Sequence, residues 1–337
     1  MARRRPTPGQ GTLFDPPVPR PDLASYDLIV VNISGGKDSQ EMLRLVVTLC
    51  IALGIVDRIV CVFADLGADD EWPGAEEMAR YHASRYGLRF EVVRKGENTG
   101  RPVTLLEHIE ARELWPDMDN RFCTSDLKRD PISTVITRLC DELRKRWKAT
   151  LPKGCRARLR RVRVLNCMGL RAQESPARAA TAAFESNKRL TNATVKHVDN
   201  WLPIHSWTED QVWAGIRESG VKYHPVYDAG MPRLSCRFCV LAGRKALVRA
   251  AQLDPAGALK RARLEDKFQA RRAARAMACL LFAQAAPQAA GMALTCLKWA
   301  LRSGHTFKNG LSMYDIIAEA EALTARGEVA AAANWIG

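Results

Sequence analysis

A short loop rich in glycine and hydroxyl side chains follows the first long apolar run of the chain, Leu28–Ile33. It reads Ser34-Gly35-Gly36-Lys37-Asp38-Ser39, and a segment with helical apolar spacing continues from it to Gly54. The glycines let the backbone approach an anion closely, while free N–H groups and the helix dipole favour negative charge there. Lys37 adds a positive charge, and the two serines add hydroxyl donors. The loop therefore predicts a binding site for nucleotide phosphates, with a plain glycine turn as the weaker alternative.

Three of the ten cysteines stand in contexts that suggest metal ligands. Cys236 and Cys239 form a Cys-x-x-Cys turn, and Cys123 lies in an earlier polar segment, Arg121–Pro131. Thiolates in a reducing compartment select zinc or iron–sulfur clusters. One pair alone could instead be a redox dithiol or carry no metal, so a metal site here requires Cys123 and a further ligand.

Apolar runs alternate with helical patterns over the first part of the chain. We expect strands at 28–33, 58–64 and 88–94, separated by helices at 39–54 and 74–86. A helical stretch from 104 to 148 then leads to a further strand at 161–168. Near-continuous apolar strands joined by helices indicate a parallel sheet covered on both faces. Right-handed crossovers make this a doubly wound α/β fold.

The composition divides the chain into three parts. Residues 1–25 are rich in proline and arginine and predict a flexible tail. Residues 26–240 carry the α/β pattern, with a basic insertion near 137–163, and the alanine-rich residues 241–337 predict a helical C-terminal region.

Further motifs follow the phosphate loop in order along the chain. Cys123 precedes Lys128 and Pro131, Gly169 to Arg178 reads GLRAQESPAR, and two more motifs at 201–213 and 223–230 precede the cysteine pair. With the loop, they resemble the PP-loop ATP pyrophosphatase superfamily and, within it, the PAPS-reductase-like proteins over most of residues 27–240. The chain is similar to the DNA-phosphorothioation (DndC-like) sulfurtransferase branch, whose fold is that of the adenine nucleotide alpha hydrolases.

This resemblance implies that ATP is cleaved with Mg²⁺ between its α- and β-phosphates, giving an adenylated acceptor and pyrophosphate. It implies catalytic roles for Lys37, Asp38 and Lys128, and a [4Fe–4S] cluster on Cys123, Cys236 and Cys239. A sulfur donor such as a cysteine desulfurase would then serve sulfur transfer, as in DNA phosphorothioation or RNA thiolation. The residues that would bind nucleotide or substrate are Ser34, Gly35, Gly36, Lys37, Asp38, Ser39, Asp65, Gly169, Arg171 and Arg178. For Arg171 and Arg178, an ion-pair network around Glu174 is the alternative.

The sequence departs from the related reductases in two places. Cluster-bearing reductases have adjacent cysteines where this chain has Phe122-Cys123, which leaves three matched ligands. Cys167 or Cys155 could be the fourth, a non-protein ligand could complete the cluster, or the site could hold zinc or no metal. The second departure is the C-terminal Glu-Cys-Gly nucleophile of the reductases, which neither Cys279 nor Cys296 reproduces.

The charge of the chain favours a polyanionic partner. Lysine and arginine number 51 against 37 acidic residues, a net charge of +14, and eleven basic residues fall within 137–163. We expect DNA or RNA as that partner, with a solvated helix face as the plainer explanation of the basic segment. The N-terminus lacks the apolar core of a secretory signal, and no run of about 18 apolar residues occurs, so we expect a cytoplasmic protein without membrane contact.

Two other functions fit many of these motifs. One is a sulfonucleotide reductase acting on PAPS or APS, which shares the fold but would need the missing thiol nucleophile. The other is a non-catalytic nucleic-acid-binding component of a defence or modification complex, in which the nucleotide acts only as a switch.

Overall fold

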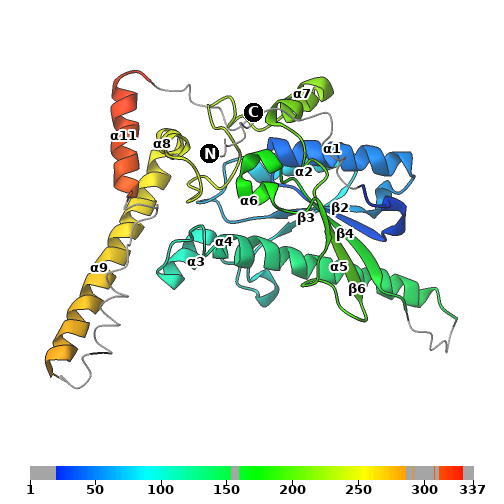
Figure 1. Ribbon diagram of the computed structural model, residues 1–337, viewed down its shortest axis with the longest axis horizontal. Coiled ribbons are helices and arrows are strands. Elements are labelled where there is room, and N and C mark those ends of the chain that lie inside the picture. The colour runs from blue at the N-terminus through cyan, green and yellow to red at the C-terminus, as the bar shows by residue number, and fades with distance from the viewer. Residues whose placement is uncertain (1–19, 153–158, 286–290, 292–306, 308–310, 329–337) are drawn as a thin grey trace, which may run out of the picture.

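The computed structural model describes residues 20–152, 159–285, 291, 307 and 311–328. They form an α/β body with a helical extension on one side (Figure 1). The predicted tail falls mostly on residues 1–19, which lie outside the described residues, as do residues 153–158 of the basic segment. The core begins at Leu23, which is buried together with Tyr26.

A six-stranded sheet in the order β3-β2-β1-β4-β6-β5 forms the centre of the body. Every neighbouring pair is parallel except β5 with β6, and in register Val30 lies between Val60 and Asn166. The strands are β1 (Leu28–Asn32), β2 (Ile59–Ala64), β3 (Arg89–Val93), β4 (Val162–Met168), β5 (Phe184–Ser186) and β6 (Lys196–Trp201). The strand order reverses between β1 and β4, and ligands of open α/β sheets bind at the carboxyl ends of strands at such a point.

Helices cover both faces of this sheet (Figure 1). The helices α1 (Lys37–Ala52), α2 (Ala75–Ser84) and α7 (Glu209–Ser219) form one layer, and α5 (Asp130–Ala149) covers the opposite face. Alternate strand residues serve the two cores: Ile29 packs on the side of α1 and Val30 on the side of α5. The predicted doubly wound α/β fold is therefore confirmed.

Two strands were not predicted from the sequence. β6 reads Lys196-His197-Val198-Asp199-Asn200-Trp201, which has no apolar run, and β5 is only three residues long. The polar side chains of β6 have partners, because the buried Asp199 accepts the Tyr26 hydroxyl at 2.8 Å and the half-buried Asn200 accepts Asn166 Nδ2 at 2.9 Å. A strand whose polar side chains are satisfied by neighbours cannot be found from apolar periodicity alone.

The helical stretch predicted over 104–148 is interrupted. It comprises α3 (Leu105–Arg112), α4 (Phe122–Thr124), a π-helical turn (Ser125–Arg129) and α5. Between α3 and α4, the Asp117 carboxylate accepts the amides of Asp119 and Asn120 at 2.8 and 2.6 Å. This local turn, next to Pro116, gives the backbone an alternative to the helix.

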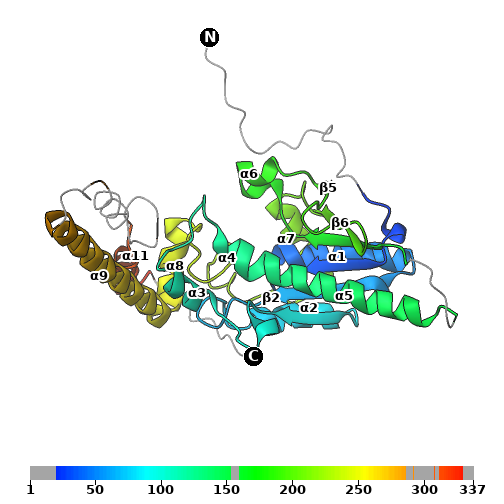
Figure 2. The same ribbon diagram turned by 90° about the horizontal axis from the view of Figure 1, so that it is seen from below.

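The described C-terminal region is helical, as predicted. It consists of α8 (Arg244–Leu253), α9 (Pro255–Ala285) and α11 (Met313–Ala325). Their apolar side chains share a core with Trp72 and Val226 of the α/β body. Arg261 of α9 also forms a buried ion pair with Asp70 at 2.5 Å, and the far end of α9 projects away from the sheet (Figure 2). None of the described helices has the length and apolar composition to cross a bilayer.

Candidate nucleotide and cysteine site

The phosphate loop joins the carboxyl end of β1 to the start of α1, at the reversal point of the sheet. Gly35 has a φ of +74°, and a Cβ there would lie 2.4 Å from the carbonyl oxygen of Ala75. Ser39 Oγ closes the loop, because it accepts Ser34 N at 3.1 Å and donates to the Gly36 carbonyl at 2.9 Å. No described residue accepts the amides of Gly35, Gly36 or Asp38. These amides are therefore available to an anion at the helix N-terminus.

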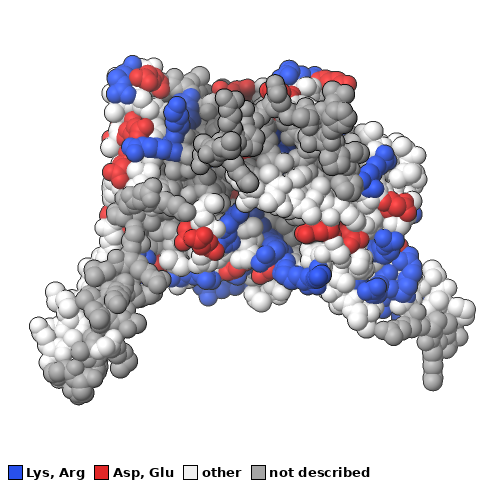
Figure 3. Space-filling view, in the orientation of Figure 1, with Lys and Arg blue, Asp and Glu red and all other residues white. Residues whose placement is uncertain are grey.

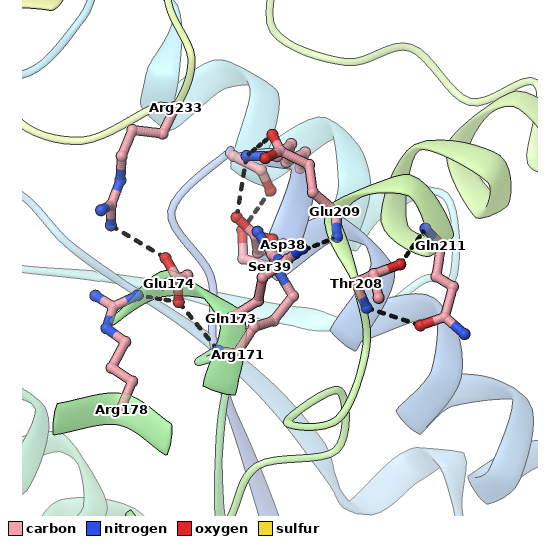
Figure 4. A network of polar contacts seen from close by, with 12 residues as sticks. Asp38, Ser39, Arg171, Gln173, Glu174, Arg178, Thr208, Glu209, Gln211 and Arg233 are labelled. Atoms are coloured by element: carbon pink, nitrogen blue, oxygen red, sulfur yellow. Dashed lines mark hydrogen bonds and ion pairs between the residues drawn. The ribbon is translucent and has the colours of Figure 1, made fainter. Parts of the chain in front are cut away.

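The segment after β4 packs directly on this loop. A Cβ at Gly169 would approach the Asp38 carbonyl to 3.2 Å, so glycine allows the close contact. Arg171 is 3% exposed, and its Nε lies 2.5 Å from Asp38 Oδ1. Gln173 then connects the network to α7, since its Oε1 accepts Arg171 Nη1 at 2.9 Å and the Glu209 amide at 2.7 Å (Figure 4). The predicted residues Asp38, Gly169 and Arg171 are thus brought together.

Lys37 is buried beside carboxylates. Its Nζ lies 3.4 Å from Asp38 Oδ2 and 3.3 Å from Glu209 Oε1, and it donates to the Pro232 carbonyl at 3.3 Å. The side chain is 2% exposed, whereas that of Glu209 is 48% exposed. A bound phosphate would have to share or replace these carboxylates, and the exposed Glu209 is the more easily displaced of the two.

Glu174 holds two arginines at the edge of the same site. It pairs with Arg178, four residues later in sequence, and with Arg233 at 3.3 Å (Figure 4). Arg178 therefore forms the ion pair with Glu174 that was its alternative role, whereas the Arg171 guanidinium pairs with Asp38 and only the Arg171 amide donates to Glu174, at 3.0 Å. Sequence reasoning missed Glu209 and Arg233. Glu209 lies inside the motif at 201–213, and Arg233 lies between the motif at 223–230 and the cysteine pair.

Asp65 lies at the end of β2, where it was predicted, but both its carboxylate oxygens have local partners. Oδ1 accepts the Gly67 amide at 2.7 Å, and Oδ2 accepts Arg94 Nε at 2.5 Å. The carboxylate is thereby tied to Arg94, which follows β3. Its role near nucleotide or Mg²⁺ stays a prediction, and Arg94 is the residue that it would have to release.

The cysteine pair lies in a segment anchored to the loop after β2. Arg237, between the two cysteines, donates its amide to the Asp70 carbonyl at 2.7 Å and its guanidinium to the Glu71 carbonyl at 2.5 Å. Cys236 and Cys123 pack against one apolar cluster, which includes Leu66, Leu127 and Phe268. The structure therefore brings together the cysteines that the sequence separates by more than a hundred residues.

Lys128 lies among these thiols, together with a carboxylate that was not predicted. Burial opposes the charge of Lys128, but Glu71, Cys236, Cys239 and Cys123 outweigh it, so its pKa is raised. Burial also raises the pKa of Glu71 to about 7, although Lys128 acts in the opposite direction. The thiol of Cys236 hydrogen-bonds that of Cys239 and lowers its pKa, with Lys128 and Arg233 adding to this effect. The three cysteines thus share one cation.

Further ligands are less well placed. Cys167 is buried in the core under α1, where burial and the thiols of Cys50 and Cys61 raise its pKa, so its suggested role as fourth ligand is wrong. Cys155 lies outside the described residues. Within the described ranges, no three His, Cys, Asp or Glu side chains are grouped so that they could hold a metal ion.

The basic segment lies at the far end of the molecule from the loop. α5 runs back from the site, and residues up to Arg161 precede β4, so the segment reaches the amino ends of the strands. Several of its cations are paired, Arg138 with Glu91 and Glu142, and Arg160 with Asp27, whereas Lys145, Arg146 and Lys148 are exposed and have no ion pair within the described chain. Figure 3 shows basic side chains both around the central hollow and near the end of α5.

Comparison with known proteins agrees with this geometry. A family model described as the phosphoadenosine phosphosulfate reductase domain matches residues 28–242. The chain belongs to this family. Membership of the PAPS reductase family identifies a PP-loop enzyme that uses a nucleotide.

Three relatives of this chain match it over different lengths. A protein of Escherichia phage 186, described as an uncharacterized 37.8 kDa protein, is 30% identical over 264 residues, which cover 67% of this chain and 70% of the phage protein. An uncharacterized protein of Methanocaldococcus jannaschii is 27% identical over 227 residues, or 67% of this chain and 45% of that protein. An adenosine 5'-phosphosulfate reductase of Shouchella clausii is 31% identical over 74 residues, or 22% of this chain and 28% of the enzyme.

Solved structures of the same superfamily are more distant. The phosphoadenylyl-sulfate reductase of Candida auris gives a TM-score of 0.39 at 16% identity, covering 64% of this chain and 84% of that one. The U34-tRNA thiolase of Methanococcus maripaludis, solved with its [4Fe–4S] cluster, gives 0.39 at 12% identity, covering 84% of this chain and 74% of that one.

The pKa values of the thiols predict which of them reacts first. At neutral pH, iodoacetamide should modify Cys239 of the metal-free protein before Cys123 and Cys236, because the thiolate is the reactive form and the pKa of Cys239 is lowered whereas theirs are raised. Burial raises the pKa of Cys50 to about 11 and of Cys61 and Cys140 to about 12, so these should react only after unfolding. Peptide mass spectrometry with and without denaturant measures the order. Labelling of Cys61 at the rate of Cys239 in the native protein would contradict it.

Proposed function

We propose that this PAPS reductase family member activates an acceptor with ATP. An acceptor oxygen attacks the α-phosphorus, the new O–P bond forms as the bond from the α-phosphorus to the α,β-bridging oxygen breaks, and pyrophosphate leaves. The observation that carries this proposal is the set of loop amides without an acceptor beside the buried Lys37 ammonium. Such fixed donors stabilise the charge that develops on the leaving pyrophosphate.

Mg²⁺ is proposed as the second cofactor of this step. It binds through phosphate oxygens, several waters and one or two carboxylates. Asp38 lies in the loop itself, and Asp65 ends the neighbouring strand. Both are paired with arginines, Asp38 with Arg171 and Asp65 with Arg94, so the metal would compete with guanidinium groups for either carboxylate.

We propose a nucleic acid, DNA or RNA, as the acceptor. The net charge of +14 supports a polyanion, and Arg178 and Arg233 lie at the edge of the site on either side of Glu174. The exposed cations of α5 lie at the amino ends of the strands, whereas the loop lies at the carboxyl ends. They would therefore contact only a polyanion long enough to extend along the whole α/β body. Arg233 is therefore the cation that we propose to contact a phosphate of the acceptor at the edge of the site.

We further propose that Cys123, Cys236 and Cys239 would hold a [4Fe–4S] cluster. The donor set fits in its chemistry, because three thiols lie near the Lys128 cation, which acts to lower the pKa of each. Lys128 thereby opposes the rise in pKa that burial causes at Cys123 and that the hydrogen bond to Cys239 and burial cause at Cys236. Bound there, the cluster would supply sulfur chemistry to the adenylated acceptor, with a cysteine desulfurase as the proposed sulfur donor and AMP as the leaving group.

A sulfonucleotide reductase is the second candidate. The family model and the 31% identity to an adenosine 5'-phosphosulfate reductase over 74 residues favour it. It would reduce the sulfate group of PAPS or APS to sulfite with electrons from a thiol, so that sulfite and the free nucleotide are released.

The choice between these activities follows from the products. With ATP and Mg²⁺, we expect pyrophosphate release that DNA or RNA stimulates, and Lys37→Ala should lower its rate by about 100-fold or more because a charge-stabilising donor is lost. Lys145→Ala, at the other end of the body, is the matched control and should behave like the unmodified protein. Sulfite release from PAPS or APS in the presence of thiol, without pyrophosphate release from ATP, would instead favour the reductase, and neither product would favour a non-catalytic component.

The proposed cluster can be tested by composition. Protein purified without oxygen should contain iron and inorganic sulfide, and Cys236→Ser should lose both because one of three cysteine ligands is removed. Cys61→Ser, a buried core substitution outside the thiol trio, should retain them. Zinc in place of iron, or equal metal content in both variants, would refute the assignment.

The position of the nucleic acid can be tested by its salt dependence. The slope of log K against log salt should be about 0.9 smaller in magnitude for Arg233→Ala if it loses one phosphate contact on DNA. Arg146→Ala is the control on α5. A reduced slope for Arg146→Ala alone would place the polyanion at the other end of the molecule.

A further inference from the structure

The hydroxyl of Tyr227 connects the phosphate loop to the cysteine segment. It accepts the backbone amide of Lys37 at 2.9 Å and the backbone amide of Leu234 at 3.3 Å. Lys37 begins α1, whereas Leu234 lies two residues before Cys236. One oxygen atom thus links the loop that we propose to bind phosphates to the segment that carries the cysteine pair.

We propose that Tyr227 is a positioning residue whose hydroxyl clamps the phosphate loop to the cysteine segment, so that a nucleotide on the loop fixes the place of the thiols. This inference rests on the proposed binding of ATP to the loop. Tyr227 needs to touch neither the reacting phosphorus nor a metal for this role, since it acts through the two amides.

The chemistry of the phenol suits a clamp that also faces an anion. Two N–H groups use both lone pairs of the oxygen, and no acceptor for its own proton occurs among the described residues. Burial raises the pKa of Tyr227, so the hydroxyl keeps this proton. The proton is then available to a phosphate oxygen near the Lys37 amide.

The ring of Tyr227 is held in place from two sides. Trp213 and Tyr223 meet it edge-on, with ring centroids 5.1 and 6.2 Å away, and Lys37 Nζ lies 5.3 Å from the ring centroid. The Tyr227 hydroxyl also restricts which side chain fits at position 36, because a Cβ on Gly36 would lie only 3.2 Å from the hydroxyl oxygen. A ring fixed in this way can transmit a shift of the loop to Leu234 instead of absorbing it by rotation.

Tyr223 offers a matched control for the hydroxyl. It belongs to the same aromatic cluster, but its hydroxyl donates to Asp228 at 2.8 Å and does not contact the loop. Tyr227→Phe and Tyr223→Phe therefore each remove one oxygen and keep the ring, and only the first removes the clamp.

The test uses the full-length chain without a cluster. It measures ATP binding and pyrophosphate release in the presence of Mg²⁺, and the alkylation of Cys239 with and without ATP and Mg²⁺. In the unmodified protein and in Tyr223→Phe, ATP should slow alkylation of Cys239. In Tyr227→Phe this protection should disappear, and KM for ATP should rise by roughly 2- to 10-fold, the range for one lost neutral hydrogen bond. A merely structural role would instead lower the melting temperature and leave the dependence on ATP intact.

The outcomes separate the clamp from the proposed function. If the unmodified protein does not bind ATP, the proposed function fails and the clamp with it. If it binds ATP but Tyr227→Phe keeps the protection, or Tyr223→Phe loses it equally, the clamp alone is refuted. Should Tyr227→Phe not fold, hydrogen exchange in the unmodified protein decides, because rapid exchange of the Lys37 and Leu234 amides would refute the clamp.

Discussion

The phosphate loop is so tightly enclosed that its backbone, and not its side chains, determines the site. A Cβ at Gly35 would lie 2.4 Å from the carbonyl oxygen of Ala75, which leaves no room for one, and a Cβ at Gly169 would lie tightly, at 3.2 Å, against the carbonyl of Asp38. A loop confined in this way keeps its amides directed at one point, and such preorganised dipoles stabilise developing charge without having to rearrange. The sheet, α2 and the segment after β4 all confine the loop, so the geometry of the anion site depends on the packing of the whole fold.

The cations of the site have carboxylate partners before any ligand binds. Lys37 and Arg171 share Asp38, while Arg178 and Arg233 share Glu174. Burying unpaired cations would be costly, whereas paired ones can exchange a carboxylate for a phosphate at a modest net change in energy. When a nucleotide binds, its phosphates replace carboxylates as partners of these cations. The affinity for the nucleotide then depends on how much more strongly the cations bind phosphate than they bind those carboxylates.

Local sequence patterns were enough to predict the phosphate loop, four strands and the doubly wound fold, because apolar runs and glycine chemistry act over short distances. They failed at β6, whose polar residues are satisfied by Tyr26, which precedes β1, and by Asn166 of β4. Glu71 and Arg233 were missed for the same reason, since their significance depends on Lys128 and Glu174, which lie far away in sequence. Cys167 was misjudged because a strand residue can face the core as readily as the site.

The buried pair between Arg261 and Asp70 gives the C-terminal helices a part in the architecture of the cysteine region. Asp70 adjoins Glu71, and its carbonyl accepts the amide of Arg237 between the two cysteines. Removing one member of a buried ion pair leaves the other charge uncompensated. A relative that kept Asp70 but replaced α9 with a helix lacking Arg261 would bury an unpaired carboxylate. We therefore expect the loop after β2 and the C-terminal helices to be retained together.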